Sequence, residues 1–141
     1  MIFKRTNMKN FILNAINNTN LLTVDTNSIE DAKDAYKVLR WKKLIPEAFK
    51  TMREQWDSLI KECFTEEELK DVNTDAEKSD ELQEKINKFN GLFNELMADD
   101  TACDIKPISF NSWHKMLKAS DIKLGMVEPE LEGILFTAPE D

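Results

Sequence analysis

The chain has 141 residues, a formal net charge of −8, and only three glycines and four prolines. This composition predicts one domain with a buried core and argues against long low-complexity segments. No run of about 18 apolar residues occurs, so no transmembrane helix is predicted. Polar residues follow Lys4 and Arg5, so we expect no signal peptide and a cytoplasmic protein.

The negative charge is concentrated in one stretch of the chain. Residues 62–104 hold 14 acidic side chains and four lysines, a net charge of −10, and the remainder carries +2. An acidic chain binds nucleic acid poorly unless a basic patch is set apart from the acidic surface. Nucleic-acid binding therefore stays an alternative that the net charge opposes. Its candidate residues are Arg40, Lys42, Lys43, Lys50 and Arg53.

Helical spacing of apolar residues predicts a short amphipathic helix over residues 8–18 and a long helix over residues 28–63. Ser28 is the expected N-cap of the long helix. Pro46 lacks an amide hydrogen, so we predict a kink there, or two helices that meet at residues 44–46. The predicted apolar stripe of the long helix is Ala32, Ala35, Tyr36, Leu39, Ile45, Phe49, Met52, Trp56, Leu59, Ile60 and Cys63.

Two capping signatures predict an acidic helical hairpin after the long helix. Thr65 with Glu68 begins a short helix, and Thr74 with Glu77 repeats the pattern before a second one. The second helix should pack antiparallel against residues 56–63, because the connection is short. Its heptad-like stripe is Leu82, Ile86, Phe89, Phe93 and Leu96.

The pattern changes after residue 100. Residues 103–110 are predicted to be extended, and Ser109 or Asn111 should cap a short helix. Residues 127–136 are predicted to form a closing helical segment, and residues 1–7 and 137–141 to be frayed. The predicted fold class is mainly all-α, a single helical domain over residues 1–141. In it a long kinked helix packs antiparallel with the acidic hairpin, followed by a short extended C-terminal segment.

No pattern in the chain indicates an enzyme. His114 is the only histidine, and no nucleophile signature accompanies it. Cys63, Cys103 and His114 are too scattered for a zinc site, and the two cysteines are predicted to stay reduced and partly buried. We therefore expect no catalytic residues, no metal and no cofactor.

Two sets of residues are candidates for contact with a partner. The first is an acidic face, for which a solvated helix start is the plainer interpretation. The second surrounds Trp41, which lies beside basic residues and off the main stripe, so we predict an exposed anchor there. The acidic face consists of Glu66, Glu67, Glu68, Asp71, Asp75, Glu77, Asp80, Glu81 and Glu84. The anchor consists of Arg40, Trp41, Lys42 and Lys43.

The order of motifs over residues 8–136 resembles a family of small uncharacterised phage and prophage helical proteins. In that family a long helix pair leads into a DI-x-x-I extended segment and a short Pro-bearing C-terminal helix. The chain departs from the pattern at Pro46, before Met8 and at Trp113-His114. The resemblance brings no catalytic residues; it implies phage origin, an infected bacterial host and a partner-binding role. It is carried by residues 8–10, 35–39, 59–62, 90–96, 103–110 and 128–135.

The predicted function is therefore non-enzymatic protein binding by a phage accessory protein. A compact acidic protein could occupy the basic nucleic-acid channel of a host defence nuclease, as anti-CRISPR inhibitors do. The alternative is a phage virion or assembly component that oligomerises. In both cases we expect a protein partner, either a host defence protein or a phage structural protein, and no membrane; the oligomeric state is left open.

Overall fold

A computed structural model describes residues 7–74 and 77–139, and the predicted mainly all-α class is confirmed. No helix within these residues is both long enough and apolar enough to cross a membrane. The α-helices are α1 (Asn10–Asn17), α2 (Ala32–Cys63), α3 (Glu66–Val72), α4 (Asp80–Ala98) and α5 (Phe110–Ala119). Three 3-10 helices, η1 (Leu21–Thr23), η2 (Thr26–Ser28) and η3 (Gly125–Leu131), and two short strands, β1 (Asn7–Lys9) and β2 (Asp100–Ala102), complete the fold.

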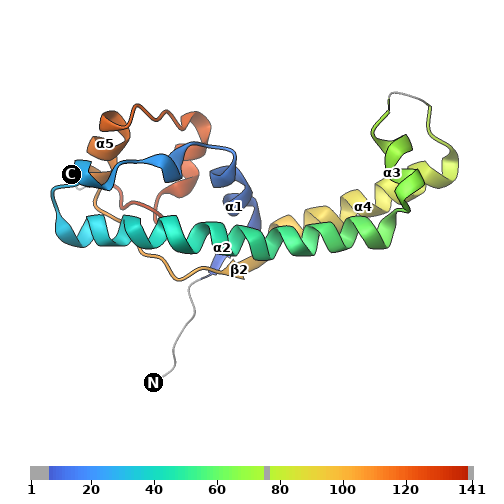
Figure 1. Cartoon of the computed structure of the whole chain (residues 1–141), viewed down its shortest axis with the longest axis horizontal. Coiled ribbons are helices and arrows are strands. Elements are labelled where there is room, and N and C mark those ends of the chain that lie inside the picture. Colours follow the sequence, from blue (N-terminus) through green and yellow to red (C-terminus); the bar gives the residue numbers. More distant parts are fainter. Residues whose placement is uncertain (1–6, 75–76, 140–141) are drawn as a thin grey trace, which may run out of the picture.

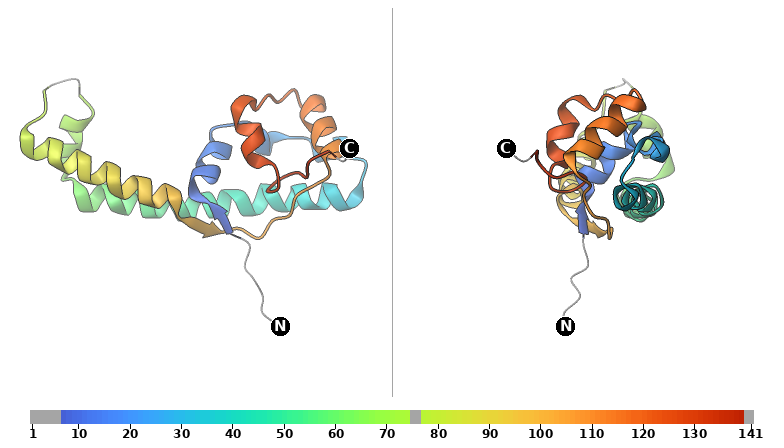
Figure 2. Two further views of the ribbon diagram at one scale, coloured as in Figure 1. Left: turned by 180° about the vertical axis from the view of Figure 1, so that it is seen from behind. Right: turned by 90° about the vertical axis from the view of Figure 1, so that its left-hand side faces the viewer.

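Helix α2 runs through two parts of the molecule. Its N-terminal half forms a body with α1, α5 and the segments around η1, η2 and η3 (Figures 1 and 2). Its C-terminal half continues beyond the body, and α4 returns antiparallel along it, with α3 at the far end (Figure 1). We call this projecting part, residues 56–74 and 77–95, the arm.

The core of the body is built on one face of α2. Val38, Trp41, Ile45, Ala48 and Met52 follow at steps of three and four and are all buried. Each large apolar side chain buried in this way contributes about 1.5–3 kcal/mol to folding. Against them pack residues of α1, of α5 and of the C-terminal segment, among them Leu13, Ile16, Trp113, Met116, Leu131 and Leu135.

The first turns of α2 bury a different face from the predicted one. Tyr36 is 61% exposed and Leu39 is 53% exposed, whereas Val38 and Trp41 are fully buried. The body covers the side of α2 that contains Asp34, whose hydrogen bonds are described below. Because the faces of a helix are fixed relative to one another, burial of Asp34, Val38 and Trp41 leaves Tyr36 and Leu39 in solvent.

Pro46 does not end the helix. Figures 1 and 2 show α2 as one continuous helix without a sharp kink, so the prediction of a kink or of two helices meeting there is wrong. Ile45 and Ala48 are buried on either side of Pro46, while the proline itself is exposed. Water can therefore hydrate the backbone where the hydrogen bond is lost, and core packing on both sides stabilises the helical conformation.

The helix caps differ from the predicted ones at two places. Asp31 caps α2 by accepting from the backbone amides of Lys33 and Asp34, whereas Ser28 lies in η2. Ser79 caps α4, so the predicted start at Thr74 is wrong. The predicted capping box of Thr65 and Glu68 and the predicted cap at Ser109 are confirmed.

A two-stranded antiparallel sheet joins the start of the chain to the end of α4. Met8 pairs with Thr101, and buried Asn10 donates from its amide to the carbonyl of Leu96 at 2.7 Å. The hydroxyl of Thr101 donates to the side-chain oxygen of Asn10 at 2.6 Å. This pair fixes the base of the arm. It also shows that Asn7, predicted to be frayed, is part of a strand; residues 1–6 and 140–141 lie outside the described part.

The predicted closing helical segment over residues 127–136 is confirmed in its first part, which lies in η3, and wrong beyond it. Helix η3 ends at Leu131, and Gly133 follows with a φ of 81°. The chain then runs beside Ile108, whose amide donates to the carbonyl of Leu135 at 2.9 Å. The amide of Thr137, a residue predicted to be frayed, donates to the carbonyl of Ile108 at 3.0 Å, so Thr137 is held in place.

Candidate interaction surfaces

The arm is held together by aromatic contacts that begin at Trp56, which also packs against the core of the body. Trp56 and Phe93 have ring centroids 4.7 Å apart, and Phe64 and Phe89 are 5.6 Å apart. The guanidinium of Arg53 lies 4.0 Å from the ring centroid of Trp56. These contacts attach α4 to α2 by tilted aromatic pairs, a geometry that adds to the gain from burial.

The predicted acidic face lies at the far end of the arm, which we call its tip. Its described residues are on α3, at Glu77 before α4, and on the first turns of α4 (Figure 1). Of its nine residues, Asp75 lies outside the described part of the chain. The side chains exposed to solvent are Glu66, Glu67, Asp71, Glu77, Asp80, Glu81 and Glu84.

Glu68 has a structural role within this face. Lys85 of α4 donates to its two carboxylate oxygens at 2.7 and 2.9 Å, and the amide of Thr65 donates to it at 3.0 Å. The hydrogen bond from Lys85, with that from the backbone of Thr65, lowers the pKa of Glu68 below its ordinary value. Glu68 thus joins α3 to α4 and holds the tip of the arm in place.

A groove lies at the tip between the end of α2 and α3. It has a volume of about 510 Å³ and an apolar floor of Ile60, Phe64 and Leu69. Asp57 and Glu66 stand on its rim beside Lys61. The groove therefore offers apolar surface next to α3, whose exposed side chains include Glu66, Glu67 and Asp71, and this suits an apolar side chain with a basic neighbour.

Trp41 is not an exposed anchor, so this prediction is wrong. Its side chain is fully buried, its ring meets Trp113 edge-on at 6.2 Å, and its indole nitrogen donates to the carbonyl of Lys106 at 3.0 Å. Trp41 falls three residues after Val38 and four before Ile45, on the buried stripe. Lys43 is exposed and Lys42 half-buried, so the four predicted anchor residues do not form one surface patch.

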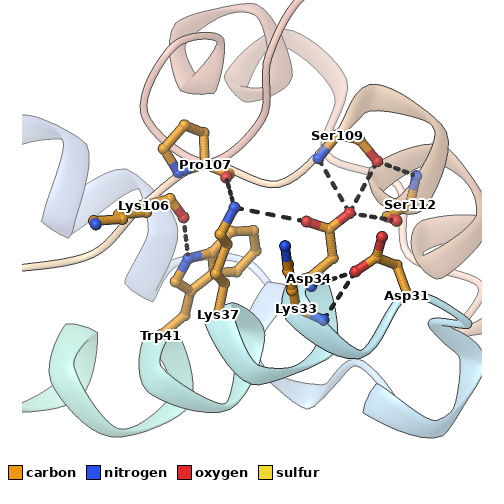
Figure 3. Close-up of polar contacts among 9 residues, drawn as sticks. All are labelled: Asp31, Lys33, Asp34, Lys37, Trp41, Lys106, Pro107, Ser109 and Ser112. Atoms are coloured by element: carbon orange, nitrogen blue, oxygen red, sulfur yellow. Dashed lines mark hydrogen bonds and ion pairs between the residues drawn. The ribbon is translucent and has the colours of Figure 1, made fainter.

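Asp34 is a residue that the sequence did not single out. Figure 3 shows its side chain pointing from the first turn of α2 toward the start of α5, where its Oδ2 accepts from the hydroxyls of Ser109 and Ser112 at 2.9 and 2.7 Å. Lys37 lies 3.8 Å from its other oxygen and donates to the carbonyl of Pro107 at 3.2 Å. A buried carboxylate is stable only with such partners. These bonds tie residues 107–112 to α2.

A second groove lies on α2 beside this contact and shares Lys37 with it. Its volume is about 570 Å³, and four of its residues are cationic: Lys33, Lys37, Arg40 and Lys106. Exposed Tyr36 also lines the groove, and among its described lining residues Asp104 is the one that is acidic. We call it the α2 groove. Of the predicted basic stretch only Arg40 lines it, and Arg53 pairs with Asp57 at 3.3 Å, so these basic residues do not gather in one place.

His114 is exposed on α5, and its ring stacks on that of Phe110 at 6.0 Å. Within residues 7–74 and 77–139, no three His, Cys, Asp or Glu side chains gather closely enough to hold a metal ion. Both cysteines are free thiols; Cys63 is half-buried and Cys103 is buried.

Comparison with protein-family models, with curated proteins and with solved structures gives no match. The resemblance to phage proteins therefore stays a prediction.

The two thiols should differ in reactivity with a disulfide reagent at pH 8. Burial, with a contribution from Asp104, raises the pKa of Cys103 to about 11. Roughly one molecule in a thousand then carries the reactive thiolate at this pH, and burial restricts access further. We expect Cys63 to react and Cys103 to react only after denaturation, which can be followed by absorbance. Equal rates in the native protein would contradict the burial of Cys103, and Cys63→Ser serves as the control that isolates it.

Proposed function

We propose that this protein acts by binding another protein through the tip of its arm, and that the partner presents a basic surface. The observation that carries the proposal is the arm itself. It projects from the body, is held together by aromatic contacts between α2 and α4, and ends in a groove beside the exposed acids of α3. Because the arm contributes little to the main core, we attribute its role to the partner that its surface contacts.

The size and charge of the arm suit an extended basic channel. Helix α4 has 19 residues, so its length is about 28 Å at 1.5 Å per residue. The exposed acids of α3 and α4 would replace the phosphates that such a channel is built to hold. The partner class that we favour is therefore a nucleic-acid-binding protein, and specifically a defence nuclease of the infected host, which an anti-CRISPR-like inhibitor would block.

Charge reversal at the tip tests this proposal. We expect the double variant Glu66→Lys with Glu67→Lys to lose at least about tenfold in affinity, because like charges then face one another across the interface. Both side chains are exposed, so the fold should be kept. The partner is first captured with the tagged protein from lysate of infected host cells and identified by mass spectrometry. Affinity is then measured by calorimetry.

The matched control is Glu130→Lys with Glu132→Lys, two exposed positions on the body with the same change in charge. Loss of binding in the tip variant alone supports the proposal. Equal affinity in the tip variant, the control and the unchanged protein would eliminate the acidic tip as the binding surface.

The alternative function is a virion or assembly component that oligomerises. The observation that favours it is the exposed apolar surface on the body, where Tyr36 and Leu39 lie in solvent. Recovery of the protein in purified phage particles would support this alternative, and recovery with a nuclease would support the first proposal.

A further inference from the structure

The α2 groove is a second binding surface that the proposed function does not use. Lys37 and Arg40 line it and are partly engaged: Lys37 donates to the carbonyl of Pro107 and lies 3.8 Å from Asp34, and Arg40 lies 3.9 Å from Asp104. Lys33 and Lys106 contribute two further cations, and neither is in an ion pair within residues 7–74 and 77–139. The groove is thus a patch of surplus positive charge around an exposed aromatic ring.

The complementary surface is on the same molecule but at its other end. Asp80, Glu81 and Glu84 are exposed on the first turns of α4, at the tip of the arm. Figure 1 shows the first turns of α2 and the tip at opposite ends of the long axis, so one chain cannot bring them together. A contact between them needs two copies.

The spacing of the charges matches on the two helices. Lys37 and Arg40 are three residues apart, as are Glu81 and Glu84; Lys33 and Lys37 are four apart, as are Asp80 and Glu84. Residues three and four apart are neighbours on a helix surface, so two adjacent helices can align these charges in pairs. The exposed ring of Tyr36 would then lie against the aliphatic stems of the acidic side chains.

The charge distribution also decides how two copies meet. Residues 56–95, which include the arm, carry −7 and the rest of the chain −1, so attraction between two copies is confined to the cations of the α2 groove and the acids of the tip. Each copy has a net charge of −8, so two copies repel each other at long range. In 0.1 M salt this repulsion is screened beyond about 10 Å, so the contacts at close range decide whether the copies associate.

We infer that the α2 groove receives the tip of the arm of a second copy, which gives a head-to-tail contact between chains. Such a contact is heterologous, so it continues into chains or closes into a ring. Exposed ion pairs are individually weak, so the association appears at roughly 0.1–1 mM protein and low salt.

Mass measurement of the full chain by light scattering and sedimentation tests the inference. We expect masses above the monomer value of 16.4 kDa in about 0.1 M salt and a return to the monomer in about 0.5 M salt. The groove variant, Lys33→Glu with Lys106→Glu, and the arm variant, Glu81→Lys with Glu84→Lys, should each remain monomeric. Mixed in equal amounts, the two should associate, because each then offers the charge that the other lacks.

The matched control is Lys118→Glu with Lys123→Glu, two exposed positions with the same change in charge as the groove variant. Circular dichroism checks that every variant is folded. A monomeric native protein at low salt and about 1 mM, undiminished association of the groove variant, or no association of the mixture would each overturn the inference. The groove variant keeps the tip of the arm, so it still binds the partner of the proposed function, and the two proposals fail separately.

Discussion

Replacement of Trp41 by alanine should destabilise the protein by about 3–5 kcal/mol, the range for deletion of a large aromatic side chain from a core. The indole is fully buried against Trp113, and its nitrogen donates to the carbonyl of Lys106. The variant would leave a cavity and remove the donor from that carbonyl. Since domains of this size are stable by only about 5–15 kcal/mol, a large share of the folding free energy is lost.

The measurement is urea unfolding followed by circular dichroism, with Tyr36→Ala as the control. Tyr36 lies on the same helix but is 61% exposed, so its removal should change the free energy of unfolding by less than about 0.5 kcal/mol. Trp41→Phe should fall between the two, because it keeps an aromatic ring and loses the hydrogen bond. Equal stabilities of the Trp41→Ala and Tyr36→Ala variants would mean that Trp41 is not a core residue.

Replacement of Asp34 by alanine should destabilise the protein by about 2–3 kcal/mol at pH 7. The change leaves the hydroxyls of Ser109 and Ser112 without their acceptor, and bonds to a charged group are stronger than neutral ones. It also removes the ion pair with Lys37. Because these bonds anchor residues 107–112 on α2, hydrogen exchange at the start of α5 should speed up more than exchange in the arm.

The contribution of Asp34 should depend on pH. Burial acts to raise its pKa, but hydrogen bonds from Ser112 and Ser109 and the charge of Lys37 outweigh it, and the pKa falls below the ordinary 3.8. The folded protein therefore binds this proton less readily than the unfolded chain. The stabilisation is complete above about pH 4 and is lost as the pH falls through the pKa of the folded protein.

The check is the difference in unfolding free energy between the native protein and Asp34→Asn at several pH values. Comparison with this variant removes the contributions of the other carboxylates, which both proteins share. The difference should be constant near neutral pH and shrink below about pH 4. A difference that grows on acidification would show that the pKa of Asp34 is raised in the folded protein.

The sequence by itself determined the helical character of the protein and much of its local detail. Period-3.6 spacing predicted the long helix, and Thr65 with Glu68 marked the start of α3, because both signals depend on residues within one or two turns. The uneven distribution of charge along the sequence located the acidic face, because the positions of charged residues in the chain are known before it folds.

Tertiary contacts decided which of the possible helix caps and which face of the long helix the folded protein uses. Ser28 and Asp31 can both cap a helix, and the one chosen places Asp34 in the first turn, facing Ser109 and Ser112 from 75 residues or more away in the chain. That contact buries Trp41 and exposes Tyr36, although both lie at helical spacing from apolar neighbours. Periodicity gives a helix its stripes, but only the partners that pack on it select the stripe to be buried.

The α2 groove also arises from contacts between segments that are distant in the sequence. Its cations come from α2 and from Lys106, which the hydrogen bond between Trp41 and the backbone of residue 106 holds beside the helix. The pairing of β1 with β2 and the passage of α2 through Pro46 likewise depend on contacts between distant segments. Local sequence carries no signal for such contacts, because their free energy arises from burial and hydrogen bonds that exist only once the chain is folded.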